Sequence, residues 1–148
     1  MKSPTGECVF CDVDGGQLLW RDAKLRVIAP EEADHPGFLR VVWNAHVAEM
    51  TDLEPADRDH LMHVVFTVEA VLRAVLQPHK VNLASFGNVV PHLHWHVIPR
   101  FREDAQFPNP VWGARLREGL VPVPPAFRAR VVTELLAKLA LAQGFSAP

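Results

Sequence analysis

One stretch of the chain alternates histidine with apolar residues over seven positions, His92-Leu93-His94-Trp95-His96-Val97-Ile98. Successive side chains of a β-strand point to opposite faces, so this spacing predicts that His92, His94 and His96 share one face of a strand. The apolar residues between them are then expected to face the core. Two chemistries suit such a row. Imidazoles can bind a transition metal ion, or one histidine can attack phosphorus while its neighbours donate protons to phosphate and leaving-group oxygens.

The two cysteines of the chain form a second candidate site, Cys8-Val9-Phe10-Cys11. On spacing alone this motif can be half of a zinc site, a thiol redox pair or a coincidence. A redox pair of the thioredoxin type is expected at the start of a helix that follows a strand, and the sequence predicts no strand before Cys8. Zinc needs two further ligands, and the spacing of the cysteines does not identify them.

Short strands are expected to position these residues, with turn-forming residues between them. The predicted strands cover 18–20, 25–28, 38–43, 81–86 and 92–100. The last two runs are joined by a turn at Gly87-Asn88 and predict an antiparallel hairpin. Because the strands come in neighbouring groups with helices inserted, the pattern favours an α+β fold with a mainly antiparallel five-stranded sheet. The chain contains neither a G-x-G-x-x-G motif nor a Walker lysine loop, which argues against a doubly wound fold.

Two helices complete the predicted fold. Apolar residues recur with helical spacing after Pro55 until Pro78 ends the helix, and Thr51 with Glu54 resembles a capping box before it. An amphipathic helix near the C-terminus carries an apolar face and closes at Gly144. We expect residues 1–105 to form one domain and residues 106–148 to form an extension that packs on the same domain.

Composition limits the classes of protein. The 148 residues are 49% hydrophobic and 22% charged, which provides for one core and excludes a disordered or fibrous chain. No apolar run approaches the ~20 residues that span a bilayer, and no apolar segment follows Lys2, so we expect a cytoplasmic protein without a membrane partner. A net charge of −2 argues against a nucleic-acid partner. The arginines of the last third are predicted to form a solvated basic face, with a local anion site as the alternative: Arg100, Arg102, Arg115, Arg117, Arg128 and Arg130.

The stretch from His92 to Ile98 resembles the signature of the histidine triad family, His-φ-His-φ-His-φ-φ with φ apolar, at every position. The Pro99-Arg100 pair that follows is also similar, and the resemblance extends from about Cys8 to Arg100. It implies a homodimeric nucleotide hydrolase or nucleotidyl transferase that attacks the nucleoside-linked α-phosphorus. Diadenosine polyphosphates, nucleoside phosphoramidates and nucleotide sugars are the candidate substrates. Two alternatives stay open: a non-catalytic nucleotide-binding regulatory dimer, and a catalytic metal held by the three histidines.

Carried over by position, the resemblance assigns roles to residues of the triad and of the neighbouring strand. His94 is the implied nucleophile, and His96 is implied to contact the phosphate or the departing group. Asn82 resembles the asparagine that faces the nucleophile in this family, although the gap to the triad is one residue shorter here.

The same resemblance implies substrate-binding residues. Asn88 stands where relatives often carry a glutamine followed by serine or threonine. Val89 cannot donate a hydrogen bond in place of that serine or threonine, which keeps the non-catalytic alternative open. Glu31 or Glu32 falls near the acid that binds the ribose hydroxyls in the family.

The zinc-binding branch of the family implies a structural zinc ion held by Cys8, Cys11, His46 and His92. A closed tetrahedron of two thiolates and two imidazoles is a common structural zinc site. Two buried thiols without a metal ion are the alternative.

The remaining histidines and one tryptophan have less specific expectations. We expect four histidines to be solvated: His35, His60, His63 and His79. Some triad proteins place a C-terminal tryptophan near the active site of the dimer partner, and Trp112 is a candidate for that role or for simple packing.

Overall fold

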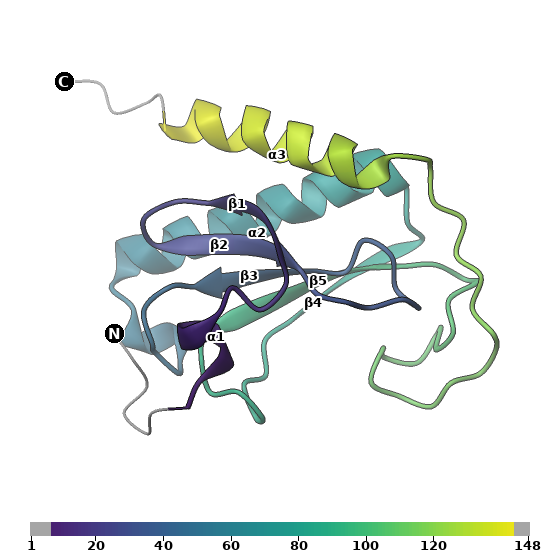
Figure 1. The fold of residues 1–148 in the computed structure, drawn as a ribbon, viewed down its shortest axis with the longest axis horizontal. Helices are drawn as coiled ribbons and strands as arrows, with labels where there is room; N and C mark the ends of the chain where they lie inside the picture. The colour runs from purple at the N-terminus through teal and green to yellow at the C-terminus, as the bar shows by residue number, and fades with distance from the viewer. Residues whose placement is uncertain (1–6, 144–148) are drawn as a thin grey trace.

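The computed structural model describes residues 7–143 and confirms an α+β fold with a five-stranded antiparallel sheet in the order β1-β2-β3-β5-β4 (Figure 1). The strands are β1 (Gln17–Arg21), β2 (Leu25–Ala29), β3 (Leu39–Trp43), β4 (Lys80–Ala84) and β5 (His94–Arg100). The helices are α1 (Val9–Asp12), the 3-10 helix η1 (Met50–Asp52), α2 (Pro55–Leu76) and α3 (Phe127–Gln143). No helix in the described part of the chain is both long enough and apolar enough to cross a membrane.

Helices α2 and α3 cover one face of the sheet, and Figure 1 shows α3 running alongside α2. Val41 of β3 and Val97 of β5 point to this face and join one continuous apolar core with both helices. The core residues of α2 recur with helical spacing and are fully buried: Leu61, Val64, Val65, Val68, Val71 and Leu72. Since side chains alternate along a strand, the even-numbered residues of β5 must face the other side of the sheet.

The start of α2 differs in one detail from the sequence prediction. Glu54 is the N-cap residue of α2 and Pro55 occupies the first turn, but Thr51 and Glu54 do not form a capping box. The capping box belongs to η1 instead, where Glu49 and Asp52 each bond the other's backbone N–H. Gln77 is the C-cap residue of α2 and has the left-handed conformation. The long helix thus lies between Pro55 and Pro78, as the sequence predicts.

Helix α1 packs on the opposite face of the sheet, where the sequence predicted no helix. Phe10 of α1 and Cys8 just before it pack against Ile28 and Val42 in a second apolar cluster. Arg26 on β2 is buried beneath α1, where its Nη2 donates to the Phe10 carbonyl over 2.7 Å. The short helix is therefore held over the face that carries the even-numbered residues of β5.

Strand β5 begins at His94, and the prediction that His92 lies on the strand is wrong. The backbone of Leu93 instead bonds two separate segments, because its N–H donates to the Val47 carbonyl and its C=O accepts from Trp43 N–H. His92 consequently lies on a bend before the strand, next to α1.

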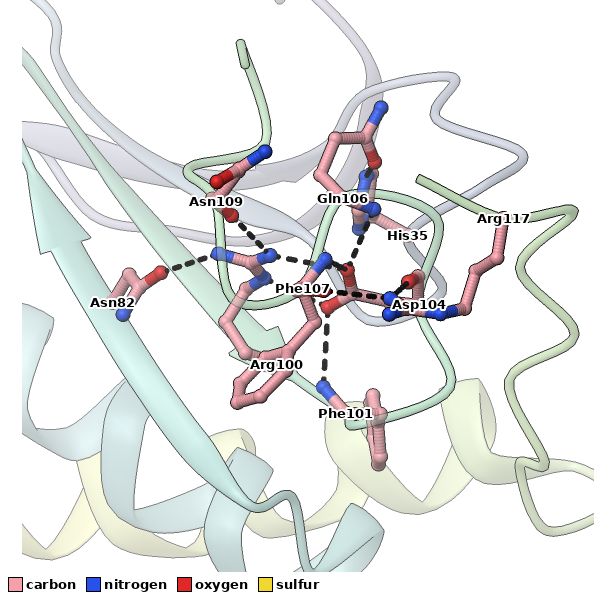
Figure 2. Close-up of polar contacts among 9 residues, drawn as sticks. All are labelled: His35, Asn82, Arg100, Phe101, Asp104, Gln106, Phe107, Asn109 and Arg117. Atoms are coloured by element: carbon pink, nitrogen blue, oxygen red, sulfur yellow. Dashed lines mark hydrogen bonds and ion pairs between the residues drawn. The ribbon is translucent and has the colours of Figure 1, made fainter. Parts of the chain in front are cut away.

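The segment after β5 is organised by a buried ion pair (Figure 2). Arg100 and Asp104 are 2% and 0% exposed, and Arg100 Nε donates to Asp104 Oδ2 over 2.8 Å. Arg100 Nη2 also donates to the Asn109 carbonyl, and Asp104 accepts from the N–H of Phe107. Arg100 is thus no part of a solvated basic face, which corrects the prediction for this arginine.

Candidate functional site

His94 and His96 lie side by side on the face of β5 that α1 covers. Their ring centroids are 4.9 Å apart, and the two residues are 7% and 5% exposed. The register with β3 places Val42 opposite His94 and Arg40 opposite His96. The alternation of the strand thus brings two of the three triad histidines together as predicted.

His94 is held by the backbone of His92. Its Nδ1–H donates to the His92 carbonyl over 2.6 Å, and the Phe10 ring lies 4.9 Å away, centroid to centroid. A neutral imidazole protonated at Nδ1 has its lone pair at Nε2. Burial lowers the pKa of His94; the hydrogen bond to the His92 carbonyl opposes this shift, and the charge of Arg40 adds to it. His94 is therefore neutral at pH 7, with its lone pair on Nε2.

His96 is held by the neighbouring strand in the opposite tautomer. Arg40 Nε donates to His96 Nδ1 over 3.4 Å, and an Nδ1 that accepts leaves the ring proton on Nε2. Burial lowers the pKa of His96 to about 3, with further contributions from His94 and Arg40. The two histidines thus present different groups, a lone pair on His94 and an N–H donor on His96.

A hollow of about 510 Å³ opens beside these two histidines. Its wall includes the ring of Phe86, which is 60% exposed, and the ring of Trp112, which is 54% exposed. The Trp112 ring centroid lies 5.0 Å from those of both His96 and Phe86. Trp112 therefore lies at the histidines of its own chain. Asn88 and Val89 also line this hollow.

A second, larger hollow of about 1010 Å³ adjoins the first. Glu31 and Glu32, both exposed, lie in the wall of this hollow after the end of β2. Arg40 lines both hollows and so lies between them.

Asn82 lies away from the predicted nucleophile. It pairs with Ile98 in the β4–β5 register, four residues along the strand from His94, or roughly 13 Å at the rise of a β-strand. Its Oδ1 accepts from Arg100 Nη1 over 2.8 Å (Figure 2). Ser85, directly after β4, contacts the backbone of His94: its Oγ donates to the His94 carbonyl over 2.7 Å.

Cys8, Cys11, His46 and His92 form a compact cluster whose four ligand atoms all lie within 4.8 Å of one another. His92 Nδ1 lies 3.4 Å from Cys8 Sγ and 3.5 Å from Cys11 Sγ, and His46 Nδ1 lies 3.4 Å from Cys11 Sγ. A tetrahedral zinc site separates such ligand atoms by roughly 3.4–3.8 Å, given its bond lengths. His92 Nε2–H donates to the Trp43 carbonyl over 2.5 Å, which leaves Nδ1 as the ligand atom. The cluster therefore has the donor set of a structural zinc site, and these three distances are compatible with one.

Comparison with known proteins matches the described sheet and triad to one family. The HIT domain matches residues 15–103, which is more than half of the chain. The chain belongs to the HIT domain family.

Solved HIT structures share the architecture. A histidine triad protein from Bradyrhizobium japonicum superposes with a TM-score of 0.68 at 27% identity, over 84% of this chain and 91% of that chain. A Zn-bound histidine triad family protein from Mycobacterium smegmatis superposes with a TM-score of 0.63 at 23% identity, over 92% and 97% of the two chains. At that identity the second comparison establishes the fold alone.

Two curated relatives carry names of enzymes. The AP-4-A phosphorylase of Mycobacterium tuberculosis is 32% identical over 88 residues, which are 55% of this chain and 45% of that protein. The bis(5'-nucleosyl)-tetraphosphatase (asymmetrical) of Schizosaccharomyces pombe is 27% identical over 95 residues, 61% of this chain and 52% of that protein. The chain spans about half the length of these curated relatives.

The other histidines of this HIT domain occupy mixed environments. The prediction that His35 is solvated is wrong, because it is 5% exposed and its Nε2 lies 2.8 Å from Gln106 Oε1. His60 is partly buried and contacts Asp22 Oδ2 at 2.7 Å. His63 and His79 are exposed, as expected.

Sequence reasoning missed Arg40 and two phenylalanine rings beside the triad, Phe10 and Phe86, whereas Trp112 was already a candidate for the site. Arg40 did leave a signal, because it is a charged residue between the apolar Leu39 and Val41 in a predicted strand. Period-two alternation places it on the face opposite the core. Phe86 left no comparable signal, since it becomes part of the site only through the loop between β4 and β5.

Proposed function

We propose that this HIT domain is a nucleotide hydrolase or nucleotidyl transferase that attacks the nucleoside-linked α-phosphorus with Nε2 of His94. The observation that carries the proposal is the hydrogen bond from His94 Nδ1 to the His92 carbonyl, which directs the lone pair of a neutral imidazole to Nε2. The enzyme names of the two curated relatives support it.

The proposed reaction has two displacements. His94 Nε2 forms a bond to the α-phosphorus while the bond from phosphorus to the leaving group breaks. The leaving group departs with the electron pair of that bond, and the Nε2–H of His96 donates to its oxygen or to a phosphoryl oxygen. The ring of His94 becomes an N-phosphorylated imidazolium, and its Nδ1 keeps its proton, which remains hydrogen-bonded to the His92 carbonyl.

The second displacement restores the enzyme. Water attacks the phosphorus, the N–P bond breaks towards nitrogen, and a proton of that water passes to solvent. The products are the nucleoside monophosphate and neutral His94. In a transferase the acceptor hydroxyl or phosphate takes the place of water.

Diadenosine polyphosphates are the proposed substrates. The curated relatives are named for the cleavage of such compounds, and the two adjoining hollows have room for the two ends of a dinucleotide. Glu31, in the larger hollow, is proposed to accept from ribose hydroxyls, and Asn88 is proposed to donate to a phosphate oxygen. Phe86 and Trp112 offer planar faces on which a base can stack.

A structural zinc ion and a dimer complete the proposal. Cys8, Cys11, His46 and His92 would hold the zinc, whose four protein ligands leave no position for substrate and so give it a purely structural role. Through His92 the site would also fix the carbonyl that orients His94. We also propose a homodimer that uses α2 and the β4–β5 hairpin; Phe66, 55% exposed on α2, supports such an interface.

The test is His94→Ala against a panel of diadenosine polyphosphates and adenosine phosphoramidates, with products identified by mass. We expect turnover to fall at least ~1000-fold, because the nucleophile acts as part of a unit. His63→Ala is the matched control, since His63 is exposed on α2. If His94→Ala keeps more than about a tenth of the wild-type rate, under ~1.4 kcal/mol of barrier, the assignment is wrong. A folded wild type that turns over no member of the panel would favour the non-catalytic alternative.

A further inference from the structure

Arg40 lies beside the histidine triad without belonging to it. It lies on β3 directly opposite His96 and lines both hollows. Its Nε donates to His96 Nδ1, so the planar fork of the guanidinium is oriented by the triad itself. The two Nη groups carry the remaining N–H donors of that fork.

Within residues 7–143 the positive charge of Arg40 has no carboxylate in direct contact. Among the described residues Arg40 takes part in no ion pair, whereas Arg26 and Arg100 are each within 4 Å of a carboxylate. Glu32 acts on it only through the longer-range field. Burial lowers the pKa of Arg40, yet a guanidinium stays charged at neutral pH. The Phe38 ring, whose centroid lies 5.6 Å from Arg40 Cζ, offsets part of the cost of this partly buried cation, and an anionic ligand would offset more of it.

The hollow beside the histidines contains little else that can neutralise a phosphate. His96 accepts at Nδ1 from Arg40 Nε, so its ring carries one proton and no charge. Among the described residues that line this hollow, Arg40 is the one with a full charge. Guanidinium groups bind phosphate oxygens through paired, charge-assisted hydrogen bonds.

We propose that Arg40 is a phosphate-binding residue of this site and that it holds His96 in the tautomer that donates from Nε2. The proposal rests on the proposed function for the identity of the ligand, a nucleotide phosphate placed between the two hollows. It makes Arg40 a catalytic residue through its contact with substrate and a positioning residue through its contact with His96.

Binding tests the phosphate contact without requiring turnover. The experiment is to measure the Kd of AMP and of adenosine by calorimetry for the wild type, Arg40→Met and Arg40→Lys. Arg40→Met is expected to weaken AMP binding about 10- to 100-fold and to leave adenosine binding unchanged, because the lost bonds are to a charged group. The AMP affinity of Arg40→Lys is expected to lie between those of the wild type and Arg40→Met, since lysine keeps the positive charge and loses the planar fork of donors. The matched control is Arg130→Met, which removes the same charge from an exposed position on α3. Arg130 lines neither hollow, so this variant should leave both Kd values unchanged.

The tautomer of His96 provides a second readout that a merely structural role would not move. In the wild type, imidazole 15N chemical shifts are expected to show the proton of His96 on Nε2. In Arg40→Met the donor to Nδ1 is gone, and the shifts are expected to move towards the average of the two tautomers. Arg130→Met should keep the wild-type pattern.

Two results would overturn the proposal. Arg40→Met could bind AMP as tightly as the wild type, or it could lose adenosine and AMP to the same degree, as a general disturbance of the pocket would cause. Failure of the proposed function can be told apart from failure of the Arg40 proposal. The first would appear as an inactive wild type or an active His94→Ala variant. The second would appear in the Kd values of AMP and adenosine, which do not depend on turnover.

Discussion

Asp104 is the residue whose replacement should destabilise this fold most for the smallest chemical change. Its two carboxylate oxygens accept five hydrogen bonds and are fully buried. Burial alone would raise the pKa of Asp104, but the hydrogen bonds from Arg100 and from the N–H groups of Phe101 and Phe107 outweigh it and lower the pKa. The carboxylate is therefore charged, and every neighbour in Figure 2 that faces it is a donor.

Asp104→Asn keeps the shape and removes the charge. One oxygen becomes an NH₂ group that faces donors, so either the two bonds to Oδ2 or the three to Oδ1 are lost. Arg100, 2% exposed, then keeps a buried charge without its partner. Breaking a buried ion pair in this way costs about 3–5 kcal/mol. For a chain of this size that corresponds to a fall in Tm of roughly 6–20 °C.

Urea unfolding of the wild type, Asp104→Asn and Asp34→Asn measures this effect. Asp34 is the matched control, because it also pairs with an arginine, Arg115, but both side chains are 45% exposed. An exposed pair contributes about 0–1 kcal/mol, so Asp34→Asn should unfold close to the wild type. A free energy of unfolding for Asp104→Asn within about 1 kcal/mol of that control would refute the reasoning.

Three further predictions follow from the site. Purified without chelator, the protein should contain one zinc per chain by elemental analysis, and Cys8→Ser with Cys11→Ser should lose the metal and lower the Tm; less than half an equivalent in folded, active protein would contradict this. His96 has a folded pKa of about 3 against an ordinary 6.5, so below pH 6.5 the unfolded state binds a proton that the folded state does not, and the free energy of unfolding falls as the pH is lowered. By pH 5 the loss from His96 is roughly 2 kcal/mol, and urea unfolding of His96→Asn should show a correspondingly weaker pH dependence than the wild type. Light scattering at micromolar concentration should give twice the monomer mass, and a monomer would exclude the proposed dimer.

The sheet and the long helix were predictable because their sequence patterns are local. Period-two alternation placed His94 and His96 on one face, and helical spacing placed α2 between Pro55 and Leu76. These patterns depend on the burial of one face of each element, and the structure buries those faces. Strand boundaries were within one or two residues of the predictions, since turn residues punctuate the chain.

The features that the sequence did not reveal depend on contacts between distant segments. His92 continues the alternation of the triad in sequence, yet its neighbour Leu93 is bonded to Val47 and Trp43, so the strand starts only at His94. In the sequence alone, Arg100 cannot be distinguished from a surface arginine, because its bond to Asp104 exists only in the folded chain. A pattern along one chain segment contains no information about such partners.

The division of labour between His94 and His96 is an outcome of this tertiary structure rather than of the histidines themselves. Two identical side chains, two residues apart on one strand, acquire different tautomers because one bonds a backbone carbonyl before the strand and the other bonds an arginine from β3. Exchange of these partners would exchange the roles. In the proposed reaction, the bend at His92, where the cysteine cluster lies, and Arg40 on β3 therefore decide which histidine attacks and which donates, and a triad sequence without these two supports would not determine the chemistry.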